Sequence, residues 1–212
     1  MATATKIILV NPRIIEMGPI DTISGVLDKE GVIVYPTETF YGLGASIFSR
    51  KAIQRIYRLK KRIPSKPLPI VISDFQMLED IVVGVPPLFQ PIVSKLWPGP
   101  LTIVLKGAPH LPEELKGASG SIGVRLTGYP WLRALVRHAG FPITATSANL
   151  TGEREISQPG KVIDVFRGKV DLIVDGGKTE GKIASTVVDL TGKNPSLIRE
   201  GAIPFSQIQK IF

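Results

Sequence analysis

The side chains best suited to chemistry are the cations that end a basic segment running from Arg50 to Lys66. This segment holds eight Lys or Arg residues and no acidic residue. Lys60 and Arg62 stand where a predicted helix gives way to a loop that two prolines stiffen, and Lys66 follows within that loop. Cations held on a stiff loop suit the phosphates of a nucleotide, because Arg offers a two-pronged donor and Lys a point charge.

Two further segments have the polar character of a binding site, and both follow apolar strands. Residues 36–44 (PTETFYGLG) carry two hydroxyls, one carboxylate and one phenol, and residues 143–152 (ITATSANLTG) end in small polar side chains. Small side chains let a ligand approach the backbone. Taken singly, the first segment could equally be a capped helix start and the second an ordinary polar turn.

Two arginines end strands that are otherwise apolar, at Arg125 and Arg199, and Ser185 opens another strand. A charge in such a place calls for an anionic partner, because burial of an unpaired charge is costly. Together with the basic loop, these arginines imply a ligand that carries several negative charges.

Composition narrows the chemistry further. The 212 residues include no cysteine and two histidines, which leaves no cysteine nucleophile and no thiolate or histidine-rich metal site, and we name no metal ligand. The net charge of +8 favours polyanionic partners such as nucleotides or nucleic acid. No stretch approaches the roughly 20 apolar residues of a membrane helix, so we expect a cytoplasmic protein that does not contact a membrane.

The elements that must position these residues alternate between strands and helices. Strands are predicted at 32–35, 69–73, 101–105, 122–126, 143–146, 172–175, 185–190 and 196–199, and several are apolar on both faces. Helices are predicted from the proline at 19, from a Ser49 N-cap to about Lys60, from Pro130 to a stop at Gly140, and after Pro204. The class is therefore α/β, with a twisted, mixed sheet covered on both sides.

Seven pieces of the chain together resemble the Sua5/YciO/YrdC/YwlC family, the threonylcarbamoyl-AMP synthases. The pieces are PTETFYGLG, KKRIPSKPL, LWPGPLTIVL, IGVRLTGYP, TATSANLTGE, ASTVVDL and LIREGAI. They occur in the family's order, and the family signature K-x-R…S-x-N falls on Lys60, Arg62, Ser147 and Asn149. The resemblance implies one domain over residues 1–212, with its core from about 14 to 202, in the short form without a C-terminal domain.

The resemblance implies a nucleotidyltransferase. Threonine and bicarbonate would form a carbamate whose oxygen attacks the α-phosphate of ATP, which Mg²⁺ accompanies. Pyrophosphate would leave, and threonylcarbamoyl-adenylate would pass to a transferase partner that modifies adenosine 37 of tRNA. The implied fold is an open, twisted, mixed or antiparallel sheet flanked by helices around a positively charged cavity.

The resemblance also assigns roles to single residues. Threonine would be held by Thr39, Arg125, Ser147 and Ser185; ATP by Arg62, Lys66, Ser121, Asn149, Ser157 and Arg199; and Lys60 would help to neutralise the phosphates. Two positions depart from the common family pattern: Ile63 stands where many members have proline, and Val71 where many have histidine.

Two alternatives stay open. The charge of +8 and the run from Arg50 to Arg62 are also typical of a protein that binds tRNA or double-stranded RNA, if only weakly, through phosphate contacts. No RNA-module signature supports that interpretation, and part of the run, Arg55 and Arg58, is predicted to be a solvated helix face. A relative that handles another carbamoyl-adenylate in hydrogenase maturation would carry cysteine motifs, and this chain has none.

Overall fold

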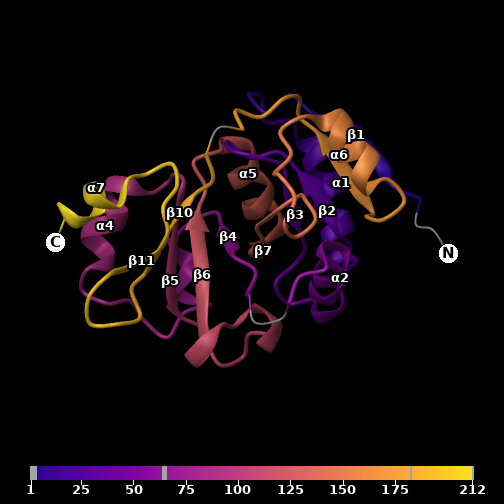
Figure 1. The fold of residues 1–212 in the computed structure, drawn as a ribbon. Helices are drawn as coiled ribbons and strands as arrows, with labels where there is room; N and C mark the ends of the chain where they lie inside the picture. Colours follow the sequence, from indigo (N-terminus) through magenta and orange to yellow (C-terminus); the bar gives the residue numbers. More distant parts are fainter. Residues whose placement is uncertain (1–3, 64–65, 182, 212) are drawn as a thin grey trace.

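A computed structural model describes residues 4–63, 66–181 and 183–211. Its strands form two sheets, not the single sheet that we predicted (Figure 1). In sheet order, the five-stranded sheet consists of β1 (Lys6–Leu9), β9 (Leu172–Asp175), β2 (Ile33–Tyr35), β3 (Gly42–Gly44) and β8 (Thr146–Ser147). The six-stranded sheet consists of β11 (Ser196–Arg199), β10 (Thr186–Asp189), β5 (Leu101–Lys106), β6 (Ser121–Leu126), β4 (Ile70–Ile72) and β7 (Ile143–Thr144).

Both sheets are mixed, which confirms the predicted class. In the five-stranded sheet, β1, β9 and β2 run parallel, and β3 and β8 continue it with antiparallel pairs. In the six-stranded sheet, β10 pairs parallel with β5 and β4 pairs parallel with β6, while the other pairs are antiparallel. Parallel pairs need long crossover connections, and these connections bring distant parts of the sequence to the same edges.

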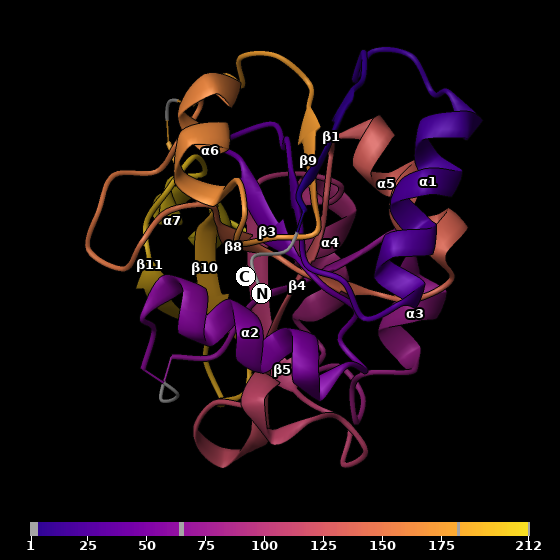
Figure 2. The same ribbon diagram turned by 90° about the vertical axis from the view of Figure 1, so that its right-hand side faces the viewer.

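Seven α-helices are found in the part of the chain that the structure describes. They are α1 (Met17–Asp28), α2 (Arg50–Lys60), α3 (Phe75–Glu79), α4 (Phe89–Leu96), α5 (Pro130–Ala139), α6 (Pro159–Phe166) and α7 (Phe205–Gln209). Helices α4 and α7 lie beside β10 and β5, and α1, α2 and α6 lie on the side of β1 and β2 (Figures 1 and 2). None of these helices is both long and apolar enough to cross a membrane.

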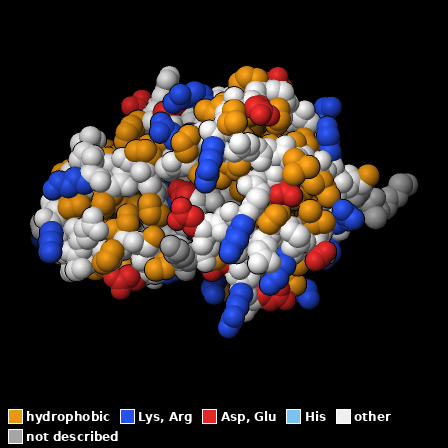
Figure 3. Space-filling model, turned by 90° about the horizontal axis from the view of Figure 1, so that it is seen from above, with side chains coloured by type: hydrophobic (Ala, Val, Ile, Leu, Met, Phe, Trp, Pro, Cys, Tyr) orange, Lys and Arg blue, Asp and Glu red, His pale blue; other side chains and the backbone are white. Residues whose placement is uncertain are grey.

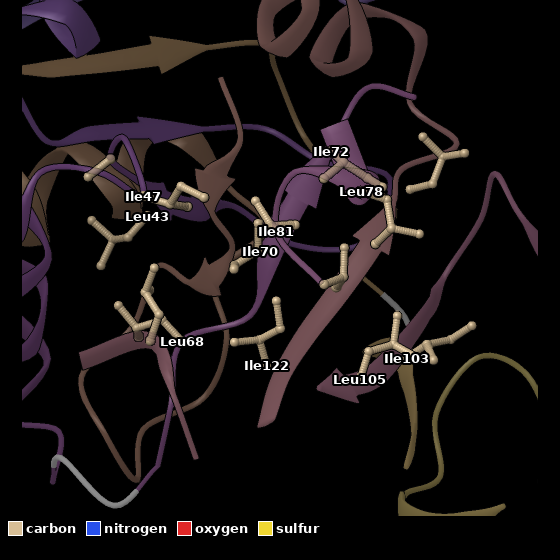
Figure 4. Packing of buried hydrophobic residues seen from close by; sticks show 14 of the residues in the cluster. Leu43, Ile47, Leu68, Ile70, Ile72, Leu78, Ile81, Ile103, Leu105 and Ile122 are labelled. Carbon is tan, nitrogen blue, oxygen red and sulfur yellow. The ribbon is translucent and has the colours of Figure 1, made fainter. Parts of the chain in front are cut away.

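The five-stranded sheet is covered on both faces, as its doubly apolar strands predicted. Ile33 and Tyr35 of β2 belong to a cluster with the apolar sides of α1 and α5. The residue between them, Val34, faces the opposite way and joins a second cluster with α2 and α6. This second cluster extends through Leu43 to Ile70 and Ile103 of the six-stranded sheet, so one continuous core joins the two sheets (Figure 4).

Helix α2 carries the predicted basic segment and has the predicted ends. Its N-cap, Ser49, accepts a hydrogen bond from Ala52 N at 3.2 Å, and its C-cap, Lys61, adopts the left-handed conformation with φ of 51°. Arg58 is exposed, as predicted for a solvated face. Arg55 differs from the prediction, because its Nη1 forms an ion pair of 2.5 Å with Asp171 and ties α2 to the start of β9.

Three other predictions were wrong in detail. The strand predicted over 143–146 is divided at Ala145, so that β7 belongs to one sheet and β8 to the other. The first helix begins at Met17, which makes Pro19 its third residue. The segment Gly42–Gly44, for which we predicted no strand, forms β3. A Cβ at Gly44 would lie 2.6 Å from the Tyr35 ring, so only glycine allows β3 to pass so close.

Candidate active site

A cavity open to solvent lies where the two sheets meet, and its empty space, counted together with the open solvent at its mouth, is about 800 Å³. Its walls come from both sheets: β2, β3 and β8 on one side, and β4, β5, β6 and β11 on the other. The sequence-predicted residues that line it are Thr39, Arg62, Arg125, Ser147, Ser185 and Arg199. The fold therefore brings together six residues that are spread over 160 positions of the sequence.

The segment between β2 and β3 forms one rim of the cavity and is held by its own hydroxyls. Thr37 Oγ1 donates to Phe40 O at 2.6 Å and accepts from Thr39 N at 3.1 Å, which is the local turn that a threonine can impose. The Thr39 carbonyl accepts a hydrogen bond from Gly181 N at 2.6 Å. This contact fixes the loop between β9 and β10 against the same rim.

Arg125, at the end of β6, is paired with a carboxylate of the chain itself. Its Nη2 lies 2.5 Å from Glu38 Oε1, and its Nε donates to Gly99 O at 3.0 Å. The two Glu38 oxygens also accept from Thr127 Oγ1, each at 3.1 Å, and Oε1 accepts from Gly128 N at 3.2 Å. Glu38 thus provides an anionic partner for Nη2 of Arg125, the strand-end arginine for which we expected one.

Arg62 follows directly after the C-cap of α2 and is oriented by its own loop. Its Nε donates to Lys66 O at 2.8 Å and its Nη2 to Pro67 O at 3.0 Å. Burial lowers the pKa of the guanidinium, and Arg199 acts in the same direction. The mutual repulsion of two arginines at one cavity is relieved by an anion, so this part of the wall is prepared for a negatively charged ligand.

Arg199 and Ser185 form the opposite wall as one unit. Arg199 Nε and Nη2 both donate to Ser185 O, at 3.1 and 2.7 Å, and Nη2 also contacts Ser185 Oγ at 3.1 Å. Ser185 Oγ lies 3.2 Å from Thr102 Oγ1 of β5. The strand pair β10–β11 thereby sets the position of the arginine, and it brings a residue assigned to threonine, Ser185, into contact with one assigned to ATP, Arg199.

Lys60 is not among the residues that line the cavity. Its ammonium is buried and donates to Ser147 O, to Asn149 O at 2.8 Å and to Asn149 Oδ1 at 3.0 Å. Ser147 Oγ in turn donates to Asn149 Oδ1 at 2.6 Å, and Asn149 Nδ2 donates to Glu153 O at 2.7 Å. Burial lowers the pKa of Lys60 to about 8, with Arg62 as the next cause. In this structure Lys60 holds the turn after β8.

The remaining predicted residues do not line the cavity. Those outside the lining are Lys60, Lys66, Ser121, Asn149 and Ser157. Lys66 is exposed, and its carbonyl, not its ammonium, contacts Arg62. Ser157 lies beside the rim, where its carbonyl accepts from Thr179 N at 3.0 Å. The two prolines and serine of the loop at 63–67 are only partly described, since positions 64 and 65 lie outside the described residues.

Several lining residues were not on our list of site residues. Glu38 and Thr127 lay inside the quoted pieces PTETFYGLG and IGVRLTGYP without a role assigned to them, whereas Glu155 carried no sequence signal. The phenols of Tyr35 and Tyr41 also line the cavity, and burial raises the pKa of each, so both are neutral hydrogen-bonding groups and not bases. Three arginines face two glutamates in the lining, which leaves a small positive excess in place of a uniformly basic surface.

Comparison with known proteins places this arrangement in context. Residues 25–201 match the protein family Sua5_yciO_yrdC, which is described as "Telomere recombination". A threonylcarbamoyl-AMP synthase of Pyrococcus abyssi is 35% identical over 207 residues, which are 98% of this chain and 61% of that protein. One from Bacillus subtilis is 34% identical over 189 residues, which are 89% of this chain and 55% of that protein. The chain thus spans less than two thirds of the length of these curated relatives.

Two solved structures share the fold. Sua5 of P. abyssi in complex with L-threonine superposes with a TM-score of 0.92 at 35% identity, covering 98% of this chain and 61% of that one. YciO of E. coli superposes with a TM-score of 0.86 at 30% identity, covering 93% of this chain and 96% of that one. The likeness to both extends over nearly all of the chain.

Proposed function

This chain belongs to the Sua5/YciO/YrdC family, and we propose that it is a nucleotidyltransferase that makes threonylcarbamoyl-AMP from L-threonine, bicarbonate and ATP. The observation that carries the proposal is the convergence of Arg62, Arg125 and Arg199, with three hydroxyl residues, on one cavity between the sheets. Curated relatives that match most of this chain are named threonylcarbamoyl-AMP synthase, and a similar structure holds L-threonine.

The proposed reaction needs positioning and charge neutralisation more than a protein nucleophile. The threonine amine and bicarbonate form a carbamate with loss of water. A carbamate oxygen then bonds to the α-phosphorus of ATP, while the bond from that phosphorus to the bridging oxygen breaks and pyrophosphate leaves. Mg²⁺ enters as part of the ATP substrate, held mainly by its phosphates. Among the described residues, no three His, Cys, Asp or Glu side chains group as a metal site of the protein's own.

The structure suggests a division of labour among the arginines. Arg125 would receive the threonine carboxylate, while Arg62 and Arg199, which line the same cavity, would face the phosphates. Ser147 and Ser185 would hydrogen-bond the ligands. We propose that Lys60 and Asn149 serve by fixing the Ser147 turn, and that the adenylate passes to a transferase that modifies tRNA in the cytoplasm.

Pyrophosphate release tests this proposal. It should require threonine and bicarbonate together, and Arg62→Ala should lower kcat/KM by about 100-fold or more, the usual cost of losing a charge-stabilising donor. Arg58→Ala is the matched control, because Arg58 is an exposed arginine of the same helical segment. ATP turnover without threonine, or equal activity of the two variants, contradicts the proposal.

Binding to tRNA or double-stranded RNA is the second candidate function. The structure favours it less than the sequence did, because several cations between Arg50 and Arg62 are paired with carboxylates or buried. Arg50 pairs with Glu114 at 3.3 Å and Arg55 with Asp171, while Lys60 is buried. On the face seen in Figure 3, Lys and Arg side chains are scattered among hydrophobic and neutral groups. A steep fall of tRNA affinity with salt that Arg58→Ala relieves would support this function.

A further inference from the structure

The contact between Glu38 and Arg125 is a charged pair at the cavity wall that the proposed chemistry does not yet use. The side chains are 22% and 11% exposed, so the pair is largely desolvated but reaches the cavity. Such a pair could act in two ways. It could be a latch that a substrate carboxylate opens by displacing Glu38, or a brace that keeps the guanidinium in place while the substrate binds beside it.

The hydrogen bonds distinguish these two possibilities. Glu38 is held independently of the arginine, since Thr127 Oγ1 and Gly128 N donate to its oxygens. Arg125 has one anchor besides the glutamate, since its Nε donates to Gly99 O. A group that had to move aside would give up several bonds at once, so the contacts indicate a brace.

The brace leaves one edge of the guanidinium for a ligand. Nε donates to Gly99 O, and Nη2 forms an ion pair with Glu38 Oε1 that lacks hydrogen-bond geometry, whereas Nη1 makes no hydrogen bond with another described residue. Arg has a planar head, so fixing two of its nitrogens fixes the direction of the third. The orientation of Nη1 therefore depends on Glu38.

We propose that Glu38 is a positioning residue that aims Arg125 Nη1 at the carboxylate of the amino-acid substrate and so sets the selectivity for that carboxylate. This inference rests on the proposed function, in which Arg125 receives threonine. Glu38 itself touches no reacting atom, and its effect passes through Arg125.

Calorimetric titration of the intact chain tests the inference. Glu38→Gln should raise the Kd for L-threonine about tenfold, which is the effect of misaligning one charged hydrogen bond. The Kd for L-threoninol, which lacks the carboxylate, and the Kd for Mg²⁺-ATP should stay within about twofold of the wild type. Glu113→Gln is the matched control, because Glu113 pairs with Lys116 at 2.8 Å on the surface and is 76% exposed; it should change none of these values.

A double-mutant cycle separates positioning from a general structural role. In an Arg125→Lys background, which lacks the planar head, Glu38→Gln should change threonine affinity by less than about twofold. Independent, multiplying effects of the two substitutions would overturn the inference. If Glu38→Gln does not fold, Glu38→Asp carries the test: it keeps the charge but is shorter, and it should weaken threonine binding while leaving threoninol binding unchanged.

The titrations of the wild-type chain separate a failure of the proposed function from a failure of the role proposed for Glu38. A wild-type chain that binds threonine no better than threoninol would overturn the proposed function, and this inference with it. A wild-type chain that discriminates between them, together with a Glu38→Gln variant that discriminates equally well, would overturn the role of Glu38 alone.

Discussion

At the scale of single residues, the site depends on side chains whose polar groups are used within the protein. Lys60 is the plainest case, since a buried ammonium gives its three donors to oxygens of Ser147 and Asn149. The four residues of the K-x-R…S-x-N signature thus have two different roles. Arg62 and Ser147 line the cavity, and Lys60 and Asn149 hold the turn that carries Ser147.

Replacing Lys60 should therefore loosen the turn. Lys60→Met removes one donor from each of three oxygens and leaves Asn149 O without the ammonium it contacts, so we expect the free energy of unfolding to fall by about 2 kcal/mol. Urea denaturation measures this change. Lys61→Met removes the same charge from the adjacent exposed position, and it should have a much smaller effect. Equal stability of the two variants would show that the contacts of Lys60 are not what holds the turn.

At the scale of elements, the sequence predicted those whose signals are local. The Ser49 cap, the proline at 130 and the glycine at 140 define helix ends by their own chemistry, and the structure confirms them. The strand β3 could not be predicted, because its glycines are explained by the Tyr35 ring of another strand. The division at Ala145 depends likewise on which sheet each half joins. Helices α3, α4 and α6 were also missed.

Helix α3 follows directly after β4, a strand of the cavity wall, and its N-cap fixes the end of that strand. Asp74 caps α3 just after β4, which carries Val71, and its Oδ1 accepts from Met77 N at 3.1 Å. Burial by itself would raise the pKa of Asp74, but hydrogen bonds from Ser73 and Met77 and the charge of Arg137 together lower it. The carboxylate is thus favoured over the neutral acid in the folded state.

The cap gives a pH-dependent prediction. Asp74→Ala should lower the free energy of unfolding by about 1 kcal/mol near neutral pH. Because the folded-state pKa lies below the ordinary value of 3.8, the charge-dependent part of this stability is present above that pH and is lost as the pH falls through the folded pKa. Asp74→Asn keeps a capping oxygen without the charge, so it should retain most of the stability and lack the pH dependence. Urea titrations at neutral pH and near pH 3 compare the three proteins.

At the scale of the whole molecule, the site exists because two mixed sheets share one core and leave a cavity where they meet. The sequence supplied the residues of that cavity through motifs at strand ends, which is where α/β folds place ligands. Six of the lining side chains were predicted in this way, but the pairings between distant residues, such as Glu38 with Arg125 and Arg199 with Ser185, could not be predicted. Whether a charged side chain is available to a ligand depends on the residue, distant in the sequence, with which it pairs in the fold.

The product of the reaction tests the central claim most directly. The protein should be incubated with Mg²⁺-ATP, L-threonine and ¹³C-bicarbonate, and the mixture examined by mass spectrometry. We predict threonylcarbamoyl-adenylate one mass unit heavier than the product formed from ordinary bicarbonate, together with pyrophosphate, and neither compound when threonine is omitted. Consumption of ATP that yields no such adenylate, or an adenylate that carries no label from bicarbonate, would contradict the account.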